Sequence, residues 1–341
     1  MKPIPAVNFG HERTISLSVI ICAHNPRPDY LRRTLDGIKA QTLPMEQWEL
    51  MLIDNGSKEP LAPVWDLSWH PHARHIREEE LGTVNARLRG VREFQGELLV
   101  FVDDDNVLKS DYLAVMANKL KDYPRIGCFG AGVLEPEFEQ EPAPELRSHT
   151  ACLALRTVTK PQWSNMMEDL IIPWGAGMGV RRVVAEKFAV DVQNSPIRKL
   201  LGRTGSNLNS CEDDEFAWIA CELGLGKGLF PNLQVTHLIG RKRVEKNYLL
   251  SISEGNGFSQ VLIAHIHQRP LVSTPQPSTF ADILGSLFRG KPFAAIRHAN
   301  SWWNYFDTPA LEREFEDAWR AGVRRGQKVL AEMKRTKTYM E

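Results

Sequence analysis

Three consecutive aspartates, Asp103, Asp104 and Asp105, follow directly on the apolar run at residues 98–102. The run predicts a buried strand, and the aspartates stand where that strand leaves its sheet. Adjacent carboxylates repel one another unless a positive charge lies between them, and a hard divalent cation takes oxygen ligands. Because such a cation usually shares its ligands with phosphates, the triplet indicates a nucleotide-diphosphate ligand. Taken alone, the triplet is equally typical of a solvated turn that Asn106 extends.

A second acidic run, Glu212-Asp213-Asp214-Glu215, opens a predicted helix at residues 212–223. One interpretation is structural, because acids in a first turn complement the helix dipole and Ser210 with Asp213 resembles a capping arrangement. Four neighbouring carboxylates exceed what capping requires, and their repulsion is expected to raise the pKa of at least one of them. A carboxylate with a raised pKa is a better general base for a hydroxyl group.

The elements that must position these acids alternate between strands and helices. Apolar runs predict strands at residues 17–23, 48–53, 75–77, 98–103, 126–129 and 229–239. Helical spacing predicts helices at residues 30–40, 84–94, 111–120, 182–188 and 212–223. The alternation predicts an α/β domain with a mostly parallel sheet, whose ligands collect at the carboxyl ends of the strands. Residues 135–161 are rich in Pro, Glu and His and predict a long functional loop.

Composition limits the function further. Lys+Arg and Asp+Glu both number 42 among the 341 residues, so the net charge of zero gives no support for nucleic-acid binding. The five cysteines form no CxxC pair, which fits a reducing compartment. Residues 1–13 contain no apolar signal segment, and no run of about 18 apolar residues occurs. We therefore expect a cytoplasmic protein, attached at most to the cytoplasmic face of a membrane.

Seven segments in order resemble the family 2 glycosyltransferases of bacterial polysaccharide and glycan biosynthesis, which have the GT-A nucleotide-diphospho-sugar transferase fold. The segments are SVIICAHN, ELMLIDNGS, GTVNARLRGV, GELLVFVDDDN, WGAGMGVRR, CEDDEFAWIACELG and VTH, within residues 16–238. Each one alone is weak, whereas the ordered set is specific. The resemblance implies a GT-A catalytic domain at residues 1–240, with a nucleotide-sugar half at about 16–132 and an acceptor half at about 133–240. Residues 241–341 would form a helical C-terminal extension.

The resemblance also implies roles for individual residues. Asp213 matches the catalytic base, and Asp105 and His237 match ligands of a Mg²⁺ or Mn²⁺ ion. The positions that match nucleotide-sugar contacts are Ala23, His24, Asn25, Asp54, Arg87, Asp103, Asp104, Gly175 and Glu212. Leu88 departs from the family, which more usually has asparagine after this arginine.

Several of these positions have a structural alternative. Asp54 could begin an Asx-turn at Asn55-Gly56, and Arg87 could be a solvated helix arginine. His237 could simply end a strand. The glycines at 175 and 177 let the backbone approach a neighbour closely, with or without a ligand.

The implied reaction is one in-line displacement that inverts the anomeric configuration, because retention through a covalent intermediate needs a second carboxylate nucleophile. The donor would be a nucleotide-diphosphate sugar, with uridine weakly favoured by family frequency, and the acceptor a glycan or a lipid-linked molecule. A processive synthase is disfavoured by the lack of spanning helices and of a Gln-x-x-Arg-Trp motif. The rivals are a sugar-phosphate nucleotidyltransferase, which should carry a Gly-rich loop where this chain has Ala23-His24-Asn25-Pro26, and a catalytically silent nucleotide-sugar-binding module.

Two features of the tail have no assigned role. Arg241, Lys242, Arg243 and Lys246 form a basic cluster that could hold a diphosphate or a phospholipid-linked acceptor, or could be solvated. Apolar positions in residues 280–288 share one helical face, and basic and aromatic residues follow it. Such a segment could lie on an anionic membrane surface or pack on its own domain.

Overall fold

The structure, a computed structural model, describes residues 15–205, 207–270, 279–289 and 291–338. The chain divides into two compact units, Met1–Leu249 and Leu250–Glu341.

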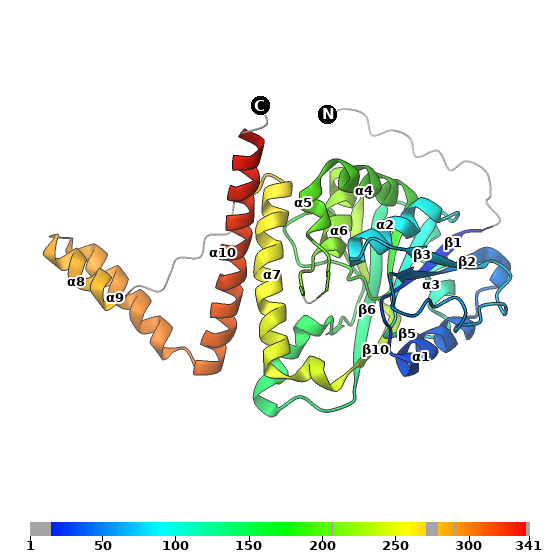
Figure 1. The fold of residues 1–341 in the computed structure, drawn as a ribbon, viewed down its shortest axis with the longest axis horizontal. Helices are drawn as coiled ribbons and strands as arrows, with labels where there is room; N and C mark the ends of the chain where they lie inside the picture. The colour runs from blue at the N-terminus through cyan, green and yellow to red at the C-terminus, as the bar shows by residue number, and fades with distance from the viewer. Residues whose placement is uncertain (1–14, 206, 271–278, 290, 339–341) are drawn as a thin grey trace. The chain divides into compact units, whose positions relative to one another are not determined.

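The first unit is built on a ten-stranded sheet (Figure 1). Its strand order is β3 (Ala73–Glu78), β2 (Trp48–Asn55), β1 (Leu17–Ala23), β4 (Leu98–Asp103), β9 (Met178–Arg181), β6 (Ile126–Phe138), β10 (Gly226–Ile239) and β5 (Asn106–Leu108). The short strands β7 (Arg156–Thr157) and β8 (Gln162–Ser164) pair with β6 and β10. Strands β3, β2, β1 and β4 run parallel, as do β6 and β10, while β9 runs antiparallel between β4 and β6.

Helices cover both faces of this sheet. The helices α1 (Pro28–Lys39) and α3 (Tyr112–Asp122) pack on one face, and α2 (Thr83–Glu93), α4 (Arg182–Asn194) and α6 (Glu212–Glu222) pack on the other (Figure 1). In β1, Val19 and Ile21 enter the first core and Ile20 enters the second. The continuous apolar run of this strand follows from burial on both faces. The remaining short helices of this unit are η1 (Met45–Gln47), η2 (Pro144–Leu153), α5 (Pro196–Lys199) and η3 (Arg241–Val244).

The sequence predicted this α/β architecture, and the differences concern the ends of strands and a short additional strand. Strand β6 continues to Phe138, well beyond the predicted end at residue 129, because its distal half pairs with β10. The segment 135–161, predicted as a loop, therefore begins as a strand and also contains η2. The three-residue strand β5 was not predicted, and it pairs antiparallel with β10.

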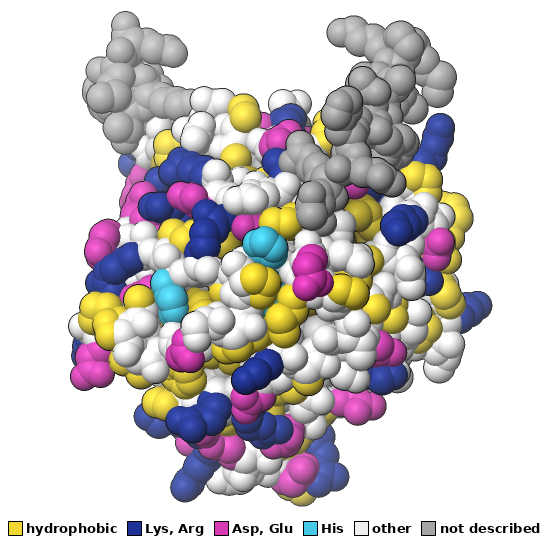
Figure 2. Space-filling model, turned by 90° about the vertical axis from the view of Figure 1, so that its right-hand side faces the viewer, with side chains coloured by type: hydrophobic (Ala, Val, Ile, Leu, Met, Phe, Trp, Pro, Cys, Tyr) yellow, Lys and Arg dark blue, Asp and Glu magenta, His cyan; other side chains and the backbone are white. Residues whose placement is uncertain are grey.

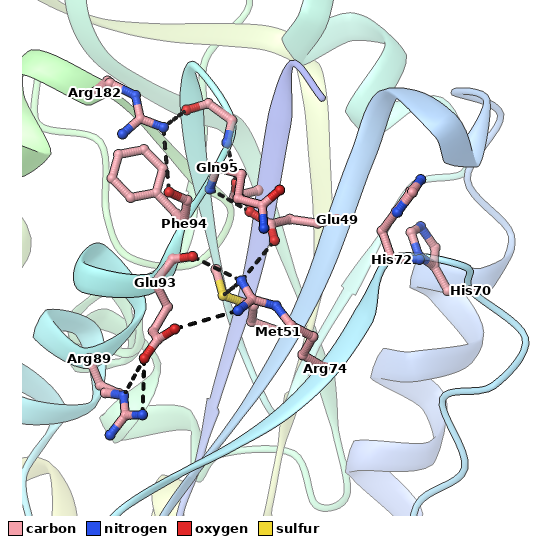
Figure 3. Close-up of polar contacts among 12 residues, drawn as sticks. Glu49, Met51, His70, His72, Arg74, Arg89, Glu93, Phe94, Gln95 and Arg182 are labelled. Atoms are coloured by element: carbon pink, nitrogen blue, oxygen red, sulfur yellow. Dashed lines mark hydrogen bonds and ion pairs between the residues drawn. The ribbon is translucent and has the colours of Figure 1, made fainter. Parts of the chain in front are cut away.

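A buried carboxylate ties the beginnings of the parallel strands together. Glu49 accepts hydrogen bonds from Ser18 Oγ at 2.6 Å, from the Gln95 amide at 2.6 Å and from Arg74 Nη2 at 2.9 Å. Figure 3 shows Arg74 reaching from β3 towards Glu49 and Glu93, so one guanidinium joins two strands to the end of α2. This network lies at the amino ends of the strands, opposite the edge that carries the acidic triplet.

The second unit is helical over the residues that the structure describes. Its elements are most of α7 (Lys246–Ile266), then α8 (Phe280–Phe288), α9 (Pro292–Asp307) and α10 (Ala310–Thr338). Glycine lets α7 and α10 approach closely, since a Cβ at Gly322 would lie 1.9 Å from the Glu254 carbonyl oxygen. Within the described part of the chain, no helix combines the length and the apolar character that crossing a bilayer requires.

Acidic and basic side chains are mixed on the face of the molecule in Figure 2, without a broad area of one sign.

Candidate active site

Two loops at the carboxyl ends of β1 and β2 are joined by side-chain hydrogen bonds. Because Ala23 is paired with Asp54 in the sheet, the loops leave the same edge side by side. His24 Nδ1 donates to the Asn55 carbonyl oxygen at 2.6 Å. Asn25, in a left-handed conformation with φ of 47°, accepts from the Lys58 amide at 2.9 Å. These contacts hold Ala23, His24 and Asn25 in a fixed arrangement at the rim where nucleotide contact was predicted.

Asp54 is buried at this rim and already has several partners. Its carboxylate accepts from the amides of Ser57 at 2.9 Å and Leu61 at 3.1 Å, and from Arg77 Nη1 at 2.7 Å. Burial opposes ionisation, but these donors outweigh it and lower the pKa of the carboxyl. The structure thus gives the Asp54 carboxylate a structural role in the loop that follows, with the Ser57 amide three residues on as a partner, and nucleotide contact by Asp54 stays a prediction.

The acidic triplet forms the turn between β4 and β5, next to the same rim. Asp103 is paired with Cys22 of β1 and has a half-exposed side chain. Burial, together with the charges of Asp105 and Asp103, raises the pKa of Asp104 well above its usual range. The chain then enters β5, where Asn106 donates to Asp105 Oδ1 at 3.0 Å.

Strand pairing brings His237 beside Asp105. In the antiparallel pair of β10 and β5, His237 lies opposite Asn106, and His237 Nε2 is 3.4 Å from Asp105 Oδ2. Arg243 Nη1 is 2.6 Å from the same oxygen and 3.0 Å from His237 Nε2. Burial alone would raise the pKa of Asp105, but the Arg243 guanidinium against its carboxylate holds the pKa well below the ordinary range.

The pair of Asp105 and His237 fits a divalent cation. Guanidinium nitrogens only donate, so Nε2 of His237 accepts from Arg243 and carries the lone pair that a metal ion would use. His237 Nδ1 is buried without a hydrogen-bond partner among the described residues. Over those residues no group of three or more His, Cys, Asp or Glu side chains could hold a metal. Two protein ligands nevertheless suit Mg²⁺ or Mn²⁺ at a phosphate, because substrate oxygens and water supply the others.

Arg87 joins the triplet to the second acidic run. Its side chain is only 5% exposed, Nη2 lies 3.7 Å from Asp103 Oδ1, and Nη1 lies 3.3 Å from Glu212 Oε1. The guanidinium packs against Gly175, where a Cβ would be 2.1 Å from Nη2. Arg87 is therefore no solvated helix arginine, and any side chain at 175 would push the Arg87 guanidinium out of its present position, whether or not a ligand binds there.

Gly175 also fixes the predicted base. Its amide donates to Asp213 Oδ2 at 3.1 Å, and the Asp214 amide donates to Oδ1 at 3.1 Å. The glycine segment is itself anchored, since Tyr112 Oη donates to the Gly177 carbonyl oxygen at 2.6 Å. Each Asp213 oxygen keeps a lone pair that could accept a proton from a substrate hydroxyl.

The acids that flank Asp213 have shifted pKa values. Burial raises the pKa of Glu212 to about 6, although the positive charge of Arg87 acts to lower it. Burial and the charge of Asp213 raise the pKa of Asp214 to about 7. Asp214 and Glu215 of the same acidic run are the alternative bases, but Glu215 is fully buried and ion-paired to Arg198 at 2.8 Å, so no acceptor can reach it.

Sequence reasoning missed two residues of this arrangement. Arg243 was assigned to a basic cluster, but it points inward to Asp105 while Arg241 and Lys242 are exposed. Tyr112 lies in the predicted helix at residues 111–120 and was given no role, yet its hydroxyl holds the glycine segment. The position of Arg243, six residues after His237, could not predict its contact with Asp105, because the direction of the side chain depends on the turn between them.

Comparison with known proteins bears on the same segments. The family model described as "Glycosyl transferase family 2" matches residues 18–188. Glycosyltransferase GlyA of Streptococcus pneumoniae is 28% identical over 109 residues, which is 31% of this chain and 15% of the relative. Glycosyltransferase AglE of Haloferax volcanii is 28% identical over 92 residues, 26% of this chain and 30% of the relative. The chain thus spans less than a third of the length of either relative.

A solved structure with a similar fold is the mannosyltransferase PcManGT from Pyrobaculum calidifontis, in complex with GDP-Man and Mn²⁺. The similarity has a TM-score of 0.54 and 16% sequence identity, and covers 91% of this chain and 86% of that chain. At this identity the likeness concerns the fold, which the two proteins share.

Proposed function

Since the chain belongs to glycosyl transferase family 2, we propose that it is a metal-dependent, inverting glycosyltransferase. It would move one sugar from a nucleotide-diphosphate sugar to a glycan or lipid-linked acceptor. The observation that carries the proposal is the convergence of two acidic segments, residues 103–105 and 212–214, on one sheet edge. Arg87 joins them, and Gly175 contacts both Arg87 and Asp213.

Asp213 is the base in this proposal. It accepts the proton of the acceptor hydroxyl, whose oxygen forms a bond to the anomeric carbon as the bond from that carbon to the diphosphate oxygen breaks. The hydroxyl attacks from the face opposite the diphosphate, so the configuration inverts. The backbone donors at Gly175 and Asp214 fix the direction of the carboxylate before the acceptor arrives.

Asp105 and His237 would hold the divalent cation. When bound there, Mg²⁺ or Mn²⁺ would neutralise the charge that develops on the departing nucleoside diphosphate. The Mn²⁺ in the Pyrobaculum mannosyltransferase, which has the same fold, agrees with this choice of metal. The donor-binding roles of Ala23, His24, Asn25, Asp54 and the other predicted contacts are part of the same proposal, as is a uridine donor.

The acceptor side of the proposal includes contact with an anionic membrane surface through α8 and α9. Large apolar side chains are exposed on these helices: Phe280, Leu284, Leu287, Phe288, Phe293, Ile296 and Trp303. Exposed basic residues, Arg289, Lys291 and Arg297, lie among them. A monomeric protein rarely exposes so many large apolar residues together, and basic residues among them complement anionic lipid. A lipid-linked acceptor would be presented at such a surface, and a cytoplasmic location stays part of the proposal.

The proposal is tested by isothermal titration of UDP, GDP and dTDP with and without Mn²⁺. We expect one nucleotide to bind the wild type only with the metal, and Asp105→Ala to lose that binding. The exposed Asp122→Ala is the matched control and should bind as the wild type does. Nucleotide binding that ignores Mn²⁺ would contradict metal dependence, and no binding of any of the three would contradict the donor class. A screen for release of nucleotide from the corresponding sugars then separates an enzyme from a silent binding module.

A further inference from the structure

The guanidinium of Arg243 lies between the two side chains that would ligate the metal. We propose that Arg243 is an internal cation that competes with the divalent metal for Asp105 and His237. The proposal rests on the metal site described above and adds a binding order to it. Metal alone binds poorly, and metal together with a nucleotide diphosphate binds well.

The contacts of Arg243 are close and enclosed. Nη1 is 2.6 Å from Asp105 Oδ2 and 3.0 Å from His237 Nε2, and both acceptors belong to largely buried side chains. A bond of this kind between a guanidinium and a carboxylate is among the stronger ones in proteins. Arg243 therefore supplies in the ligand-free protein the positive charge that the carboxylate requires.

A metal and this guanidinium cannot use the same two atoms together. Mg²⁺ binds its oxygen ligands at about 2.0–2.1 Å, so a metal on Asp105 and His237 would take the place of Nη1. The two positive charges would also repel each other in a poorly solvated site. Metal entry thus requires Arg243 to leave, which costs the hydrogen bonds that it makes.

The backbone around Arg243 allows such a departure. Arg243 belongs to the four-residue turn η3, and its backbone amide donates to the Gly240 carbonyl oxygen at 2.8 Å. The Arg243 side chain is itself 18% exposed, and its neighbours Arg241 and Lys242 are exposed. Nε of Arg243 is buried and has no hydrogen-bond partner in the described part of the chain, so the present position leaves part of the guanidinium unsatisfied.

A nucleotide diphosphate removes the conflict. Its phosphate oxygens add ligands to the metal and also offer the displaced guanidinium another anionic partner. The affinity for Mn²⁺ should therefore be higher when the diphosphate is present, partly because the displaced Arg243 guanidinium can then pair with a phosphate. Removal of Arg243 should raise the affinity for Mn²⁺ alone and reduce the gain that the diphosphate brings.

The test measures free Mn²⁺ by electron paramagnetic resonance, with and without UDP or whichever nucleotide the first titration identifies. We compare the wild type, Arg243→Gln, Arg243→Lys and the control Arg241→Gln, which removes the same charge from an exposed side chain of the same turn. We expect Arg243→Gln to bind Mn²⁺ alone about tenfold more tightly, since it loses a charged hydrogen bond that competes with the metal. Arg243→Lys keeps a competing charge, so its affinity for Mn²⁺ alone should be nearer that of the wild type. Arg241→Gln should have the same affinity as the wild type.

Equal or weaker binding of Mn²⁺ alone by Arg243→Gln would overturn the inference, as would the same increase in Arg241→Gln. If the wild type binds Mn²⁺ with nucleotide while the Arg243 variants show no change, only the inference fails. If no variant binds Mn²⁺ even with nucleotide, the metal site of the proposed function fails as well. Thermal unfolding of each variant shows that a change in binding does not come from loss of the fold.

Discussion

Arg87 Nη1 lies 3.3 Å from Glu212 Oε1, and both side chains are at most one tenth exposed. Replacement of Arg87 by alanine would leave Glu212 buried without this partner. Breaking a buried pair by removing one member costs about 3–5 kcal/mol, so we expect Arg87→Ala to lower the free energy of unfolding by about that amount. Urea denaturation measures the loss.

The control for this prediction is Arg89→Ala on the same helix. Arg89 pairs with Glu93 four residues on, and both side chains are about one third exposed, so the loss should be below about 1 kcal/mol. If Arg87→Ala has the same free energy of unfolding as the wild type but binds nucleotide weakly, Arg87 acts as a ligand contact and does not stabilise the contact between the two acidic segments.

The second prediction separates the proposed base from its neighbour. Asp213→Asn keeps the shape of the side chain but cannot accept the acceptor proton, so we expect transfer to fall by at least about 100-fold. The affinity for nucleotide and Mn²⁺ should stay near that of the wild type, because Asp213 contacts backbone amides and not the Asp105 site. Asp214→Asn should retain most of the transfer. Initial rates together with titration of nucleotide check both variants, and near-normal turnover of Asp213→Asn would remove it as the base.

The sequence predicted the sheet edge and its acids because both depend on local pattern. Apolar runs such as residues 17–23 must be buried, and parallel strands must release their loops at one edge, so Asp54 and Asp103 were expected at the same edge. The partners of those acids could not be predicted in the same way. Glu49 with Arg74, Arg87 with Glu212, and Asp105 with Arg243 join residues 25, 125 and 138 positions apart, and only the packed structure brings them together.

The third prediction concerns pH and follows from Asp214. Its pKa is about 7 in the folded protein, through burial and the charge of Asp213, against an ordinary value near 4 in the unfolded chain. The folded state therefore binds more protons between about pH 4 and 7, so this group lowers stability as pH rises through that window. Below about pH 4 both states are protonated and the effect is absent.

Asp214→Asn removes this penalty. We expect the variant to be more stable than the wild type at pH 8, by on the order of 1–2 kcal/mol, and the gain to shrink towards pH 4. Thermal unfolding at a series of pH values checks it, with the exposed Asp122→Asn as the control. A gain that is the same at every pH would mean that the asparagine acts by packing and not by charge.

The fourth prediction concerns the network at the other end of the strands. Glu49→Ala removes the acceptor for Ser18, Gln95 and Arg74, so buried donors lose their partner. We expect a loss of about 2–4 kcal/mol in the free energy of unfolding, with nucleotide affinity unchanged in the fraction that stays folded. The matched control, Glu79→Ala, breaks an ion pair to Arg77 in which the carboxylate is 75% exposed, and should cost less than about 1 kcal/mol. A loss in Glu79→Ala as large as in Glu49→Ala would show that burial of the network is not what stabilises it.

The last prediction concerns α8 and α9. Phe288 and Phe293 are 88% and 87% exposed, and Arg289 and Lys291 lie between them in the sequence. If these helices lie on an anionic bilayer, each phenylalanine that enters it adds roughly 2 kcal/mol, and the basic residues add electrostatic attraction. The double variant Phe288→Glu with Phe293→Glu should then sediment with anionic phospholipid vesicles at least about tenfold less than the wild type, while nucleotide binding is retained. Val64→Glu, at a 64% exposed position in the first unit, is the control and should sediment normally. Equal binding to neutral and anionic vesicles by all three proteins would contradict contact of α8 and α9 with an anionic membrane. A wild-type dimer that the double variant abolishes would also contradict it, because the same apolar surface would then bind a second copy of the chain.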